Sequence, residues 1–119
     1  MTSIERRHTG PRMSQIIVHG DTVYLAGQVA DATAGGSVQD QTREILQRID
    51  RLLAEVGSDK TKVLQATVWL ANIADFAAMN TVWDTWVAPG QTPTRACVGA
   101  SLAGPSYAVE IRVIASRAG

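Results

Sequence analysis

The chain has 119 residues, a length typical of one domain, and 45% of them are hydrophobic, which excludes intrinsic disorder. Eleven basic and eleven acidic residues cancel, so no net charge favours binding to nucleic acid or to a membrane surface. One cysteine and two histidines exclude a disulfide framework and a cysteine-rich zinc site, and we expect no metal. The chain shows no secretory signal and no apolar run long enough to span a bilayer, so a cytoplasmic protein is expected.

The opening segment, residues 1–12, is polar and ends at Gly10-Pro11, which predicts a solvated N-terminal arm. The next two segments, residues 14–19 and 22–26, are rich in β-branched and apolar types. Because Gly20-Asp21 separates them, the pattern predicts a hairpin of two strands.

The clearest pattern predicts a helix from Val38 to Val56, where apolar residues recur at steps of three and four. Ser37 is a typical N-cap, because its hydroxyl can accept a hydrogen bond from a free backbone N–H. Gly57 suits the position after the helix, where the backbone often turns left-handed.

Three strands and a second helix complete the prediction. Residues 63–70 predict a strand, and an apolar stripe predicts a helix that begins at Asp75 and ends before Pro89-Gly90. Residues 94–101 and 107–115 predict the last two strands.

The predicted order is β-β-α-β-α-β-β within one α+β domain, residues 1–119. Two helices on one face of a mixed sheet is the economical packing for this order. A chain of this length has no third layer, so a subunit interface is the expected cover for the other sheet face.

The candidate functional residues lie in the last two predicted strands. Glu110 and Arg112 alternate with apolar residues, which places both charges on one face of the final strand. Arg95 begins the preceding strand among small or apolar neighbours, where a guanidinium needs an anion. That anion is either Glu110, in a structural pair, or the carboxylate of a ligand bound through two hydrogen bonds.

Cys97 shares the sheet face of Arg95, because side chains two positions apart in a strand point the same way. It is either a small buried residue or a nucleophile, and no histidine can be placed beside it to activate the thiol. The tryptophans Trp69, Trp83 and Trp86 are expected in the core. No phosphate-binding loop or nucleophile elbow is present.

Several sequence blocks together resemble one known family. They are VYLAGQV at residues 23–29, the helix at 41–53, DFAAMNTVWDTW at 75–86, PTRACV at 93–98 and VEIRVIA at 109–115. In these blocks the chain resembles the RidA/YjgF family of reactive-intermediate deaminases, and the middle helix is most similar to the YoaB-like branch.

The resemblance implies a chorismate-mutase-like α+β fold and a homotrimer with its sites in the clefts between subunits. It also implies hydrolysis of 2-imino acids and their enamine tautomers, of the 2-aminoacrylate type, to 2-keto acids plus ammonia. The family uses no metal or organic cofactor, so the implied partners are a 2-imino or 2-keto acid and further copies of the chain.

By the same resemblance, the substrate-binding arginine falls on Arg95, the site cysteine on Cys97 and the glutamate on Glu110. Arg95 is expected to hold the substrate carboxylate, and Glu110 to orient a water molecule and move its proton. The main-chain carbonyl of Cys97 is expected to help hold the substrate nitrogen. The family's asparagine falls on Asn80, for which a structural role is favoured over catalysis.

Two positions depart from the family pattern. Met13 and Ala26 stand where the family often has a tyrosine and a serine, so two hydroxyls are missing from the expected site wall. The favoured interpretation is a 2-imino acid deaminase. The missing hydroxyls support an alternative, a non-catalytic trimer that binds a keto acid or an amino acid. RNA cleavage ranks last, because the chain lacks a basic surface, a histidine pair and a metal site.

Overall fold

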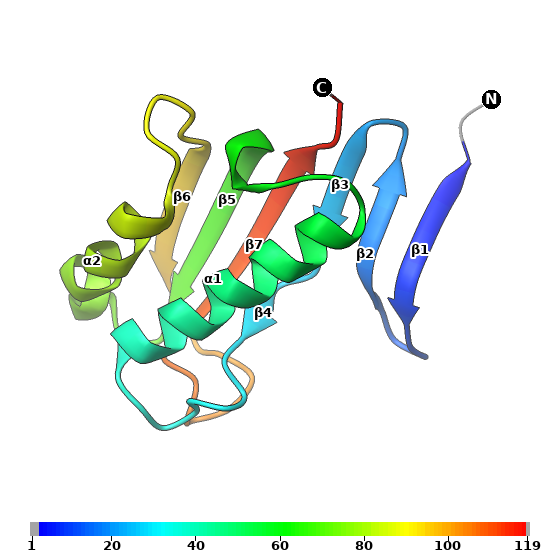
Figure 1. Cartoon of the computed structure of the whole chain (residues 1–119). Helices are drawn as coiled ribbons and strands as arrows, with labels where there is room; N and C mark the ends of the chain where they lie inside the picture. The colour runs from blue at the N-terminus through cyan, green and yellow to red at the C-terminus, as the bar shows by residue number, and fades with distance from the viewer. Residues whose placement is uncertain (1–2, 119) are drawn as a thin grey trace.

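The computed structural model describes residues 3–118, in which two helices cover one face of a mixed sheet (Figure 1). The elements are β1 (Ile4–Thr9), β2 (Ser14–His19), β3 (Thr22–Leu25), β4 (Gln28–Val29), α1 (Val38–Glu55), β5 (Val63–Leu70), α2 (Phe76–Trp86), β6 (Thr94–Gly99) and β7 (Val109–Ser116). The strand order is β1-β2-β3-β7-β5-β6, with β4 paired to β7. Strands β5 and β6 are parallel and the other pairs antiparallel, so the predicted α+β fold is confirmed.

Helix α1 begins and ends where its sequence predicts. The Ser37 hydroxyl accepts a hydrogen bond from the backbone N–H of Asp40 at 3.1 Å, which satisfies one free donor of the first turn. Gly57 has a φ of 79°, the left-handed conformation that a residue with a Cβ adopts at a cost. Neither α1 nor α2 is long and apolar enough to cross a membrane.

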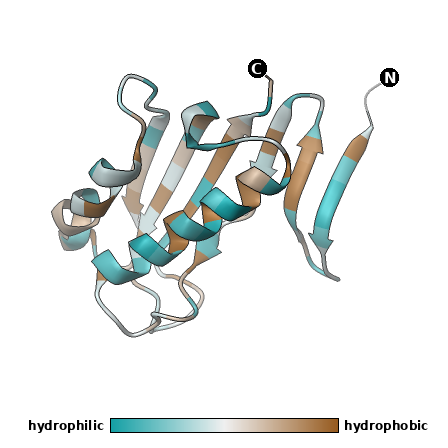
Figure 2. Cartoon of the chain, viewed as in Figure 1, coloured by the Kyte–Doolittle hydropathy of each residue, from teal (hydrophilic) through white to brown (hydrophobic). Residues whose placement is uncertain are grey.

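The expectation of a solvated arm over residues 1–12 is wrong for residues 4–9, which form β1 along β2. The guanidinium of Arg7 donates to the backbone carbonyl of Glu55 at 3.0 Å, and His8 Nε2 lies 2.9 Å from the Glu55 carboxylate. An edge strand pairs on one side only and tolerates charged side chains, which is why a polar sequence forms one here. Figure 2 shows β1 largely hydrophilic beside the hydrophobic β2.

The core lies between the sheet and the helices. In β7 the apolar residues at alternate positions, Val109, Ile111, Val113 and Ala115, are fully buried beneath this layer. Trp83 and Trp86 belong to the core as predicted, whereas Trp69 does not. Trp69 is the register partner of Glu110 and lies half-buried on the opposite sheet face. The helices leave this opposite face, hereafter the open face, uncovered (Figure 1).

Candidate functional site

Arg95 lies on the helix side of the sheet, under α2. Its register partner in β5 is Ala66, a core residue, which fixes the face on which the arginine side chain emerges. The guanidinium donates through Nη1 to Oδ1 of Asn80 at 2.8 Å. Its Cζ lies 5.0 Å from the ring centre of Trp83 and 5.7 Å from that of Phe76. Two aromatic rings and a neutral amide therefore hold a half-buried cation in place.

Cys97 points to the same face as Arg95, as predicted, and packs against the core beside Val68. Burial raises the pKa of its thiol, and the nearby charge of Arg95 opposes that effect without reversing it. The thiol is therefore protonated at neutral pH and is suited to lining a site rather than to nucleophilic attack. Arg95, Asn80 and Cys97 together form what we call the arginine half.

Glu110 lies on the open face, because its neighbours Val109 and Ile111 are buried on the helix side. Its carboxylate rests against the backbone of Gly27, which joins β3 to β4. A Cβ on Gly27 would overlap Oε2 of Glu110 and would lie 3.0 Å from its Cδ. The contact therefore requires glycine at position 27, a requirement that the sequence alone did not reveal.

The structural pair between Arg95 and Glu110, one of the two alternatives from the sequence, is contradicted. The two side chains emerge from opposite faces of the sheet, and β5 lies between their strands. Two strand spacings separate them by roughly 10 Å across the sheet. The sequence does not reveal this separation, because the sheet face on which a side chain emerges depends on the strands with which its own strand pairs.

A concave surface of about 480 Å³ lies on the open face next to Gly27. Ala26 is one of its lining residues, together with Ser14, Ile17, Tyr24, Leu25, Gly27, Arg112 and Ile114. We call Glu110, Ala26 and Gly27 the glutamate half. Met13 precedes Ser14 in the turn from β1 to β2, is 49% exposed, and borders a separate hollow beside Pro11 and Arg12. The structure thus gathers the predicted site residues other than Met13 into two groups on opposite faces of one chain.

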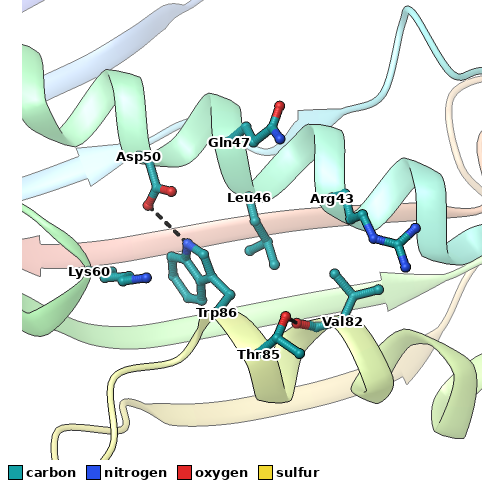
Figure 3. Close-up of a pocket in the computed structure, with 8 residues that line it drawn as sticks. All are labelled: Arg43, Leu46, Gln47, Asp50, Lys60, Val82, Thr85 and Trp86. Atoms are coloured by element: carbon teal, nitrogen blue, oxygen red, sulfur yellow. Dashed lines mark hydrogen bonds between the residues drawn. The ribbon is translucent and has the colours of Figure 1, made fainter.

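A further pocket, of about 170 Å³, lies between α1 and α2 and contains no predicted site residue (Figure 3). Its floor is formed by Leu46, Val82 and Trp86, all buried core side chains. The indole Nε1 of Trp86 donates to Oδ1 of Asp50 at 2.9 Å, a hydrogen bond that joins the two helices (Figure 3). Among residues 3–118, no cluster of histidine, cysteine, aspartate and glutamate has the arrangement of a metal site.

Known proteins resemble this chain both in sequence and in fold. Residues 6–117 match the family model described as Endoribonuclease L-PSP. The chain is 41% identical over 114 residues to a RutC family protein of Haemophilus influenzae, covering 96% of this chain and 98% of the relative. It is 40% identical over 114 residues to the RutC family protein YoaB of Escherichia coli, with the same coverage of 96% and 98%. A crystal structure of a YjgF family member from Neisseria meningitidis superposes with a TM-score of 0.94, at 43% identity over 98% of this chain and 97% of the other.

Proposed function

The chain belongs to the RutC/YjgF family, also called RidA/YjgF, and we propose that it hydrolyses 2-imino acids and their enamine tautomers to 2-keto acids plus ammonia. The observation that carries this proposal is the environment of Arg95. Its partner is the neutral amide of Asn80, and no described carboxylate lies within 4.0 Å of the guanidinium. A fixed, half-buried arginine without a counter-ion suits the carboxylate common to all 2-imino acids.

The position of Glu110 supports a site shared between subunits. Because Arg95 and Glu110 occupy opposite faces of one chain, a single small substrate reaches both only where two copies meet. The open face supplies apolar surface for such an interface: Tyr24 is 43% exposed and Val98 is 45% exposed. We therefore infer a homotrimer in which the arginine half of one protomer faces the glutamate half of the next.

The proposed reaction makes modest demands on the protein. Arg95 holds the substrate carboxylate, and water adds to the electrophilic carbon of the protonated imine while Glu110 accepts a proton from the water. The neutral carbinolamine that results is protonated on nitrogen by the same carboxyl group. Its carbon–nitrogen bond then breaks, ammonia leaves, and the hydroxyl group returns its proton to the Glu110 carboxylate as its oxygen becomes the keto oxygen. The protonated thiol of Cys97 contributes to the wall beside the substrate and forms no bond with it.

A coupled assay tests this function. An amino-acid oxidase generates 2-imino acids from a panel of amino acids, and imine decay is followed with and without the protein. Arg95→Ala should lower kcat/KM by about 30-fold or more, because a desolvated carboxylate loses its charged partner. Arg95→Lys should restore little, because an ammonium group cannot reproduce the two-pronged contact. Wild-type turnover by a folded Arg95→Ala trimer contradicts the mechanism, and saturable binding without ammonia release favours the non-catalytic interpretation.

Mixed trimers test the shared site directly. Arg95→Ala chains and Glu110→Gln chains are each expected to be inactive alone. If each site takes one residue from each of two neighbours, co-assembled chains regain about a quarter of the sites. Mixing that restores no activity, in trimers shown by mass spectrometry to contain both chains, contradicts a site built from two protomers.

A further inference from the structure

We propose that Arg112 is a second anion-binding group of the site and that it selects 2-imino acids with a second carboxylate, the four- and five-carbon 2-imino diacids. This inference rests on the proposed function and names its substrate class. Arg112 is two residues after Glu110 in β7, so its side chain emerges on the same, open face. The two positions are roughly 7 Å apart along the strand, a gap that a short carbon chain and an arginine side chain bridge.

Arg112 lines the hollow that also borders Ala26 and Gly27 of the glutamate half. It lines the concave surface of about 480 Å³ together with Ala26 and Gly27, and Gly27 is the residue against which the Glu110 carboxylate rests. Ser14 and Tyr24 line the same surface and supply hydroxyl groups. Glu110 does not itself line this concavity, and Gly27 is the contact between its carboxylate and the surface that Arg112 lines.

The charge of Arg112 is fixed in place but not neutralised. Its Cζ lies 5.6 Å from the ring centre of Trp69, which orients the guanidinium while leaving its N–H groups free. Its side chain is exposed, and among residues 3–118 no carboxylate lies within 4.0 Å of it. Once a second copy covers the open face, this cation loses water and requires an anion.

A ligand carboxylate supplies that anion with suitable geometry. The α-carboxylate of the substrate is assigned to Arg95 of the neighbouring protomer, so the carboxylate that reaches Arg112 must be a second one. Ile17 and Ile114 also line the hollow, and among its described lining residues Arg112 is the only charged one, beside the neutral hydroxyl groups of Ser14 and Tyr24. The guanidinium fork binds a carboxylate through two parallel hydrogen bonds, which gives a diacid an advantage over a monoacid of similar size.

The test compares two imines of matched chemistry. Aspartate oxidase generates 2-iminosuccinate, an amino-acid oxidase generates 2-iminopropanoate from alanine, and decay of each imine is followed with the protein present. Arg112→Gln should lower kcat/KM for 2-iminosuccinate by about 30-fold or more and leave that for 2-iminopropanoate within about three-fold. The matched control is Arg51→Gln, which changes an exposed arginine of α1 and should alter neither value.

Calorimetric binding of two keto acids separates this inference from the proposed reaction, because it requires no turnover. The wild-type protein should bind oxaloacetate more tightly than pyruvate, and Arg112→Gln should abolish the difference. Equal affinities in the wild-type protein overturn the inference, whether or not any imine is hydrolysed. So does a variant that loses its trimeric mass in light scattering and its activity on both imines equally, since Arg112 would then serve the interface.

Discussion

Gly27 and Glu110 lie in direct contact, with the carboxylate occupying the space that a side chain at position 27 would fill. Glu110 is the second residue of β7, and Gly27 lies in the short connection between β3 and β4. The backbone at position 27 thus determines where the carboxylate of Glu110 can rest.

Gly27→Ala should therefore displace the Glu110 carboxylate and lower kcat by about 100-fold, the effect of misplacing a reacting group by about 1 Å. KM should change little, because Arg95 and its contacts lie on the other face. The shorter side chain of Glu110→Asp leaves room for the new methyl group, so the double variant should recover part of the loss. Steady-state kinetics on the coupled assay measure both effects.

Gly99→Ala is the matched control for this substitution. A Cβ on Gly99 would lie 3.5 Å from Cβ of Ile73, an ordinary van der Waals contact, so kcat should stay close to the wild-type value. A kcat of Gly27→Ala equal to that of Gly99→Ala would show that the Glu110 position does not matter for the reaction.

Asn80→Asp should raise KM for the imine substrate by about ten-fold or more. The substitution keeps an acceptor 2.8 Å from the Arg95 guanidinium but makes it an anion, which competes with the substrate carboxylate for the same charge. Because the Arg95 guanidinium stabilises the ionised form of the new carboxyl group, the competition should persist across the neutral pH range. KM of Asn80→Asp and of the wild type measured from pH 6 to 8 checks this, and a KM equal to the wild-type value contradicts it.

Asp50→Ala should lower the free energy of unfolding by about 1–3 kcal/mol, because it leaves the indole N–H of the buried Trp86 without its acceptor. Asp50→Asn keeps an acceptor oxygen and should cost less. Urea denaturation followed by tryptophan fluorescence measures both variants. Equal stability of Asp50→Ala and the wild type would indicate that solvent replaces Asp50 as the acceptor.

Alkylation of Cys97 by iodoacetamide should be slow at pH 7 and should accelerate as the pH rises beyond the pKa of an ordinary thiol. Burial raises the pKa of this thiol, so the reactive thiolate forms only at a higher pH than in a free cysteine. Mass spectrometry of the alkylated protein gives the rate at each pH, with free cysteine as the reference. A rate at pH 7 above that of free cysteine contradicts the assignment of Cys97 as an unreactive wall residue.

Much of the local structure could be predicted from the sequence. The spacing of apolar residues, with Ser37 and Gly57 at the ends, located α1, because a helix repeats over a few residues and its caps are local contacts. Alternation within a strand placed Arg95 with Cys97 and Glu110 with Arg112, because the side-chain period of a strand is fixed at two. The pattern of the last two strands singled out Arg95, Cys97 and Glu110, and the family resemblance added Asn80, Met13 and Ala26.

Only the tertiary structure decided how these local pieces face one another. The parallel pairing of β5 with β6 put Arg95 under α2, and the pairing of β5 with β7 put Glu110 on the other face. The pairing of β1 with β2 turned a charged segment into an edge strand. In each case the relation between strands depends on partners distant in the chain, and a shift of one residue exchanges the two faces. Alternation along a strand therefore determined which residues share a face, and strand pairing alone determined which face it is.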